Sequence, residues 1–226
     1  MAYDLILFDC DGTLVDSEYL NIKAIIELIT EYGVDGYDVT HGLNHFSGHR
    51  FSRILDMITK ETAFQFPKDA GQRYLEKVRM LAKTDMKIIA GVQNMVIAAQ
   101  ENASIYVVSN GERKNVLLSL EFAGLTPYFS DERVISGAMS PNPKPAPDLF
   151  LMASTHANIS PEKSLVIEDS LAGVHGAVAA GMEAWGFCGA HHDHKGHTLK
   201  LLDAGASKVF PTMEEMRTCL ISAYTK

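Results

Sequence analysis

Two aspartates, Asp9 and Asp11, stand one residue apart in the stretch FDCDGT, directly after the apolar run LIL. Carboxylates this close repel one another, and each loses hydration when the end of a strand is covered. Packing alone does not favour such a pair, because only a bound cation or a reaction that uses the acids offsets its free-energy cost. The stretch therefore predicts a catalytic or cation-binding site.

Polar residues also end two later apolar runs. Ser109 and Asn110 close the run SIYVVSN, and Glu168 and Asp169 lie in VIEDS. In open α/β sheets ligands bind beyond the carboxyl ends of the strands, so we expect these side chains to meet at one crevice. Converging carboxylates require a hard cation with oxygen ligands. We predict Mg²⁺ before Ca²⁺, because the site also keeps water and substrate oxygens.

A lysine between two prolines supplies the opposite charge. In PNPKPAP, Pro143 and Pro145 restrict the backbone on each side of Lys144 and so limit the freedom of its long side chain. Taken alone, Lys144 is also compatible with a solvated loop lysine. Ser109 and Asn110 precede a predicted helix, where a hydroxyl and the first helical amides can hold an anion or simply cap the helix.

The segments that carry these residues predict the fold. Continuous apolar runs are typical of strands covered on both faces, as in a parallel sheet. Helical patterns lie between the runs, and strand alternating with helix predicts a doubly wound α/β fold with a Rossmann-like parallel sheet. The expected strands lie at residues 5–9, 104–110, 164–170 and 183–189, with weaker candidates at 133–137 and 207–212.

One segment breaks this alternation. Residues 16–86 contain no convincing strand, but three helical patterns begin near residues 18, 49 and 71. We predict that they form an α-helical cap inserted into a core of residues 1–15 and 87–226, and that this cap is a lid at the sheet edge where the first strand ends. Helices that simply pack beside the sheet are the alternative.

Composition limits the classes of function. The chain has 226 residues, a formal charge of -8 and 46% hydrophobic residues, which is typical of a globular protein. The charge argues against general nucleic-acid binding and against attachment to an anionic membrane. Cys10, Cys188 and Cys219 are too few and too scattered for a disulfide framework or a zinc motif. We expect a cytoplasmic protein, and a monomer, that binds neither nucleic acid nor membrane.

The same residues carry a resemblance to a known family. DCDGT, VVSNG, the lysine of PKP and the acidic pair of VIEDS resemble, in order and spacing, the four motifs of the haloacid dehalogenase superfamily of phosphotransferases. The chain is similar to its subgroup with a helical cap after the first motif. The stretch LAGVHGAVAAGM extends the match over the core.

The resemblance implies roles for the motif residues. Asp9 would be the nucleophile that forms an aspartyl-phosphate, and Asp11 would act as general acid and then as base. Ser109 and Lys144 would grip the transferring phosphoryl group, which makes Asn110 a phosphate-binding candidate beside them. Mg²⁺ would be the cofactor.

The resemblance also implies the ligands of that ion. They would be Asp9, the main-chain carbonyl of Asp11, and Asp169, with Glu168 in support. A carboxylate is a weak nucleophile toward a dianionic phosphate, so its charge must be neutralised first.

Two activities are compatible with this motif set. The first is a phosphatase of small phosphorylated metabolites, in particular sugar or sugar-acid phosphates. The alternative is a phosphomutase resembling β-phosphoglucomutase, in whose family a histidine of the first cap helix helps to gate transfer to sugar rather than to water. The matching position here is Asn21, which cannot take up a proton. This departure favours hydrolysis.

Substrate contacts are expected from the cap. Arg50 and Lys77 lie where similar capped sugar-phosphate enzymes place cations, and Asn21 is a further candidate. For Arg50 and Lys77 the alternative is that both are solvated helix charges.

A histidine-rich stretch, GAHHDHKGH, extends from Gly189 to His197. Neutral imidazole can bind a transition metal. Because the stretch is flanked by glycine and follows an expected strand, we predict a flexible surface loop instead.

Overall fold

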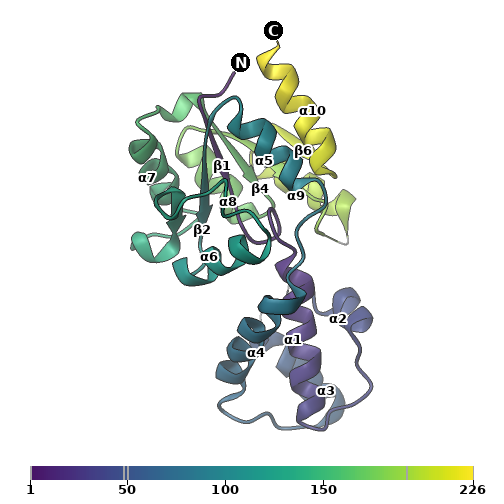
Figure 1. Cartoon of the computed structure of the whole chain (residues 1–226). Coiled ribbons are helices and arrows are strands. Elements are labelled where there is room, and N and C mark those ends of the chain that lie inside the picture. Colours follow the sequence, from purple (N-terminus) through teal and green to yellow (C-terminus); the bar gives the residue numbers. More distant parts are fainter. Residues whose placement is uncertain (1, 48, 50, 192, 226) are drawn as a thin grey trace. The chain divides into compact units, whose positions relative to one another are not determined.

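The computed structural model describes residues 2–47, 49, 51–191 and 193–225. Its backbone contacts divide the chain into two compact units, one formed by Met1–Asp16 with Ile88–Lys226 and the other by Ser17–Lys87 (Figure 1). We call the first the sheet unit and the second the helical unit.

The sheet unit contains six strands in the order β3-β2-β1-β4-β5-β6. Every neighbouring pair is parallel, which confirms the predicted doubly wound α/β fold. The strands are β1 (Leu5–Phe8), β2 (Ser104–Ser109), β3 (Val134–Ser136), β4 (Ser164–Glu168), β5 (Glu183–Phe187) and β6 (Lys208–Phe210). All four residues of β1 are buried, as expected of a central strand covered on both faces.

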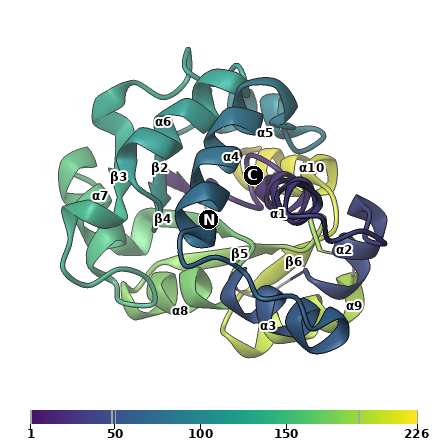
Figure 2. The same cartoon turned by 90° about the horizontal axis from the view of Figure 1, so that it is seen from below.

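Helices connect the strands and cover both faces of the sheet, with α5 and α8 on opposite sides in Figure 2. Leu5 and Leu7 of β1 pack with Phe150 and Val174 in one hydrophobic core. The helices of this unit are α5 (Val92–Gln100), α6 (Arg113–Phe122), α7 (Asp148–Ala157), α8 (Leu171–Ala179), α9 (His194–Asp203) and α10 (Met213–Tyr224), and three short 3-10 turns lie at Asp131–Arg133, Gly137–Met139 and Pro161–Lys163.

The helical unit has a hydrophobic core of its own. Ile25 and Ile29 of one helix pack with Ile54 and Ile58 of another, and their spacing by four places each pair on one helical face. The helices are α1 (Ser17–Glu31), α2 (Val39–His45), α3 (Phe51–Thr62) and α4 (Ala70–Asp85). Among the described residues, no helix is both long enough and apolar enough to cross a membrane.

The histidine-rich stretch differs from its prediction. Helix α9 begins within it at His194, and the side chain of Asp193 caps the helix by accepting a hydrogen bond from the N–H of Gly196 at 2.9 Å. The polar residues and flanking glycines of this stretch predicted a loop. An aspartate directly before a helical pattern also predicts the start of a helix, and Asp193 was such a residue.

Candidate active site

The carboxyl ends of neighbouring strands bring the acidic motifs together. In the register of the sheet, Phe8 of β1 pairs with Val107 of β2 and Ile167 of β4. Asp9 directly follows β1, and its N–H donates to the carbonyl of Ile167 at 2.9 Å. Glu168 is the last residue of β4. The two carboxylates therefore lie side by side at one edge of the sheet.

Lys144 lies between these two carboxylates. Its Nζ donates to Oδ1 of Asp9 at 2.7 Å, to Oε1 of Glu168 at 2.6 Å and to the carbonyl of Val108 at 2.6 Å. Burial alone would lower the pKa of Lys144, but the two carboxylates raise it above its usual value. The ammonium group is therefore charged, and each of its three hydrogens has an acceptor.

Glu168 is held at both oxygens. Oε1 accepts from Lys144, and Oε2 accepts from the N–H of Ser170 at 3.0 Å and from its hydroxyl at 2.9 Å. Gly173 in the first turn of α8 leaves room for this carboxylate, since a Cβ there would lie 1.7 Å from Oε1 of Glu168. The carboxylate is thus fixed by packing as well as by hydrogen bonds.

Asp169 is contacted from two other segments of the chain. The hydroxyl of Thr13 is 3.5 Å from its Oδ1, Nε2 of His191 is 3.2 Å from its Oδ2, and Nε2 of His197 is 2.6 Å from its main-chain oxygen. Gly12, at φ +80°, passes so close that a Cβ would lie 2.1 Å from Oδ2. His191 lies in the predicted loop, whereas His197 lies in helix α9, and both rings contact this aspartate.

The acidic cluster fits a hard divalent cation. Oxygens of Asp9, Glu168 and Asp169 lie within 4.8 Å of one another. Burial, followed by the charge of Glu168, raises the pKa of Asp9 and of Asp169 well above the usual value, in spite of the opposing effect of Lys144. A single ammonium group leaves this cluster short of positive charge. Carboxylate oxygens in this number are the ligand type that Mg²⁺ prefers.

Asp11 and Ser109 approach the same edge from two strands. Asp11 is exposed, whereas Ser109 is buried and its Oγ accepts from the N–H of Gly111 at 3.0 Å. A Cβ at Gly111 would lie 3.2 Å from Oγ of Ser109 and 3.8 Å from Oδ2 of Asp11, which places both side chains beside the same peptide. The acid is open to solvent, as a proton donor to a substrate must be.

Asn110 has a contact that the sequence did not indicate. Its Nδ2 donates to the carbonyl of Lys144 at 3.0 Å, and its Oδ1 accepts from the N–H of Lys144 at 2.8 Å. Both ends of the amide thus hold the main chain of the lysine. These contacts favour a role in fixing Lys144 over direct phosphate binding by the side chain.

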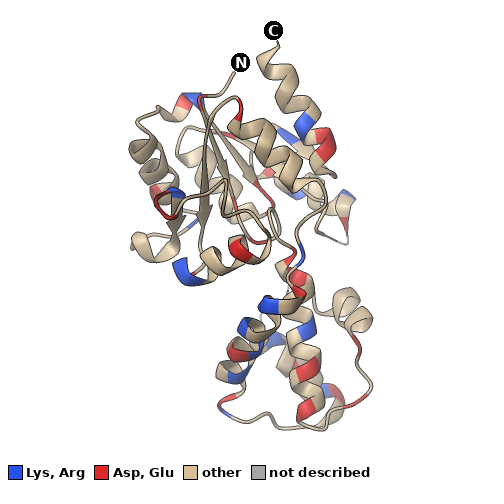
Figure 3. Cartoon of the chain, in the orientation of Figure 1, with Lys and Arg blue, Asp and Glu red and all other residues tan. Residues whose placement is uncertain are grey.

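The candidates in the helical unit have different surroundings. Oδ1 of Asn21 accepts from the hydroxyl of Tyr74 at 3.1 Å. Nζ of Lys77 is 2.6 Å from Oε1 of Glu31 and 3.4 Å from Oε2 of Glu27, on helices where Figure 3 shows both signs of charge. These two glutamates favour a structural role for Lys77 over a contact with substrate. Arg50 lies outside the described residues.

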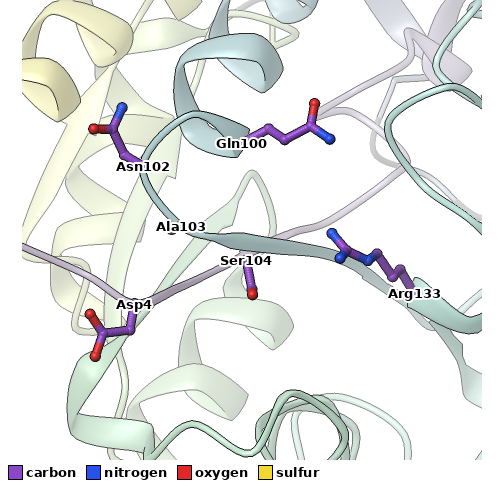
Figure 4. Close-up of a pocket in the computed structure, with 6 residues that line it drawn as sticks. All are labelled: Asp4, Gln100, Asn102, Ala103, Ser104 and Arg133. Carbon is purple, nitrogen blue, oxygen red and sulfur yellow. The ribbon is translucent and has the colours of Figure 1, made fainter.

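A pocket at the start of β2 is a separate feature (Figure 4). It is polar and open, and the residues that line it are Asp4, Gln100, Asn102, Ala103, Ser104 and Arg133. It lies at the amino ends of the strands, opposite the edge that carries Asp9. Since ligands of such sheets bind at the carboxyl edge, the acidic cluster is the better candidate for catalysis.

Comparison with known proteins identifies a family and several relatives that are phosphatases. Residues 6–187 match the model of a family described as haloacid dehalogenase-like hydrolase. The chain is 30% identical over 191 residues to a 6-phosphogluconate phosphatase of Escherichia coli, which covers 84% of this chain and 85% of the relative. It is 28% identical to a fructose-1-phosphate phosphatase of the same organism, over 80% of this chain and 95% of the relative.

A solved structure gives a similar result. A haloacid dehalogenase family hydrolase from Deinococcus radiodurans, determined with bound phosphate and sodium, superposes with a TM-score of 0.82 at 30% sequence identity. The match covers 98% of this chain and 96% of that one.

Proposed function

The chain belongs to the haloacid dehalogenase-like hydrolases, and we propose that it is a Mg²⁺-dependent phosphatase of small phosphorylated metabolites, in particular sugar or sugar-acid phosphates. The observation that carries the proposal is the buried Lys144 ammonium group, held between Asp9 and Glu168 beside the carboxylate of Asp169. The similarity to phosphatases of 6-phosphogluconate and fructose 1-phosphate supports the substrate class.

In the first step Asp9 is the nucleophile. Its Oδ1 is bonded to Lys144, which leaves Oδ2 to attack phosphorus. The bond from Oδ2 to phosphorus forms while the ester bond from phosphorus to the leaving oxygen breaks, and Asp11 gives its proton to that oxygen. A divalent cation held by Asp9, Asp169, Glu168 and the main chain of Asp11 would neutralise the phosphate charge that otherwise repels the carboxylate.

In the second step water attacks the phosphorus of the aspartyl-phosphate. Asp11, now ionised, takes a proton from the water, and the bond between phosphorus and Oδ2 of Asp9 breaks to release inorganic phosphate. The hydroxyl of Ser109 can donate to a phosphoryl oxygen. Lys144 can do so only by giving up one of its three present acceptors, so its first effect is to oppose the rise in the pKa of Asp9 that burial and Glu168 cause.

We propose that the helical unit, Ser17–Lys87, is the cap that selects substrates. Asn21 in α1 accepts a hydrogen bond from Tyr74. The amide of Asn21 does not titrate, and burial raises the pKa of Tyr74 to about 12, so the phenol keeps its proton near neutral pH and cannot act as a base. This pair supports transfer to water rather than gated transfer to a sugar. The free cysteines Cys10, Cys188 and Cys219 fit the reducing cytoplasm that we propose as the location.

The test is release of inorganic phosphate from sugar phosphates, sugar-acid phosphates, phosphoglycolate and nucleotides, with Mg²⁺ and with EDTA. Asp9→Asn provides the blank. Release that requires Mg²⁺ and is absent from the blank supports the proposal, and the ranking of substrates narrows the class. Turnover by Asp9→Asn would overturn the assignment of the nucleophile. Isomerised sugar phosphate without phosphate release would identify a phosphomutase.

A further inference from the structure

Two histidines that the mechanism does not use meet at Asp169. Nε2 of His191 lies 3.2 Å from Oδ2 of the carboxylate, and Nε2 of His197 lies 2.6 Å from its main-chain oxygen. Both come from the segment between β5 and the first turn of α9, whereas Asp169 follows β4. The side chain and the main chain of one acidic residue are therefore held by the same neighbouring segment.

The acceptors determine where the hydrogens are. A carbonyl oxygen only accepts, so Nε2 of His197 must carry a hydrogen and donate it. A carboxylate that binds a cation is ionised and likewise only accepts, so in that state Nε2 of His191 donates to Oδ2 of Asp169. Both contacts are available to imidazoles in their neutral form with the hydrogen on Nε2.

The two rings also restrict each other. Their centroids are 3.5 Å apart at an interplanar angle of 22°, so neither ring can rotate without moving the other. His197 lies in the first turn of α9, whose start is fixed by the Asp193 cap. His197 therefore contacts Asp169 from a helix whose start is fixed, and a side chain on a helix is positioned more precisely than one on a loop.

We propose that His191 and His197 are positioning residues that hold Asp169 in the orientation that binds the divalent cation. The inference rests on the proposed metal-dependent function and deepens it, because it assigns a role at the site to two histidines that the mechanism does not use. Some residues hydrogen-bond to a metal ligand and fix its orientation. Removing such a residue typically lowers the metal affinity about 10- to 100-fold.

The experiment measures metal binding without turnover. Mn²⁺, which shares the preference of Mg²⁺ for oxygen ligands, is titrated into the full chain in the absence of substrate, and free Mn²⁺ is counted by electron paramagnetic resonance. Displacement by Mg²⁺ then gives the Mg²⁺ affinity. Circular dichroism confirms that each variant is folded, which we expect for His191 because its side chain is 30% exposed.

We expect His191→Ala to weaken Mg²⁺ binding about 10- to 100-fold. His191→Gln keeps an N–H at a similar distance from the backbone and should restore most of the affinity, which a purely structural role would not produce. His194→Ala is the matched control, because His194 is an exposed histidine of the same stretch, at the start of α9, and its affinity should equal that of the wild type.

Two results would overturn the inference in distinguishable ways. If the wild type binds Mg²⁺ and His191→Ala binds it equally well or more tightly, the positioning role is wrong while the proposed function stands. If the wild type and Asp169→Asn show no difference in Mg²⁺ binding, the metal site of the proposed function fails and the inference fails with it.

Discussion

Nζ of Lys144 donates to Oδ1 of Asp9 at 2.7 Å, although the two residues are 135 positions apart in the sequence. The same ammonium group bonds to Glu168, so one buried cation pairs with carboxylates at the ends of two neighbouring strands. This arrangement fixes one oxygen of Asp9 and leaves the other for chemistry. It also makes the candidate site and the stability of the sheet edge depend on one side chain.

Lys144→Met should therefore reduce both stability and activity. The substitution leaves Asp9 and Glu168 buried without their cation, and breaking a buried pair in this way costs about 3 to 5 kcal/mol. Urea unfolding at neutral pH measures the loss. Lys163→Met is the control, because the Lys163 pair with Asp4 is exposed, and its unfolding curve should match the wild type. Equal curves for all three proteins would contradict the prediction.

Gly173→Ala should displace Glu168. A Cβ there would lie 1.7 Å from Oε1, so the carboxylate must leave Lys144, and the loss should exceed about 2 kcal/mol despite the helix propensity of alanine. Gly71→Ala is the matched change in a helix with nothing within 4 Å of the new methyl group. It should leave stability unchanged or raise it by up to about 1 kcal/mol. Thermal unfolding of the two variants gives the comparison.

Asn110→Ala should impair catalysis more than folding. The variant loses both hydrogen bonds to the main chain of Lys144, and a lysine out of place by even about 1 Å can cost on the order of 100-fold in rate. Steady-state phosphate release measures kcat. In the same segment, Asn142 bonds to Asp148 and not to the lysine, so Asn142→Ala should keep its rate. A rate for Asn110→Ala equal to that of Asn142→Ala would refute the positioning role.

The pH dependence of stability should show a contribution from Glu183. Burial alone would raise the pKa of Glu183, but hydrogen bonds from Ser207, Tyr3 and Trp185 lower it below its ordinary value of 4.5. A lowered pKa in the folded state gives stability that is present above the ordinary pKa and is lost as pH falls through the lowered value.

Glu183→Gln should accordingly be about 1 to 2 kcal/mol less stable than the wild type at pH 7, with a gap that closes under acid. Urea unfolding at pH 7 and at the lowest pH where the wild type remains folded tests this. Glu121→Gln, at an exposed position of α6, should follow the wild type at both values. A difference in unfolding free energy that widens under acid would contradict a lowered pKa of Glu183 in the folded state.

The sheet could be predicted from the sequence because apolar runs mark its strands and a general rule places the carboxyl ends of parallel strands at one edge. Each strand was visible as an apolar run, and a polar residue directly follows β1 or ends β2, β3 and β4. Parallel strands present their carboxyl ends at one edge, so Asp9 and Glu168 were expected near each other without any knowledge of packing. The lysine between prolines was recognisable by its charge and its stiff surroundings.

The partners of these residues could not be predicted, because they depend on contacts between segments that no local pattern relates. Asn110 bonds to Lys144 across 34 positions, and His191 reaches Asp169 across 22. The glutamates around Lys77 lie 46 and 50 positions earlier in another helix. In each case the residue type permitted several roles, and only the tertiary contact distinguishes among them.

The strand order also bears on how the chain folds during synthesis. β1 precedes the other five strands of this sheet in the sequence, yet it lies between β2 and β4 and pairs with residues 104–107 and 164–167. Pairings over such separations are slow to form, and they must wait until the later segment has left the ribosome. The apolar β1 therefore lacks one of its two neighbouring strands until β4 has been synthesised, and the cluster of Asp9, Glu168 and Asp169 can assemble only then.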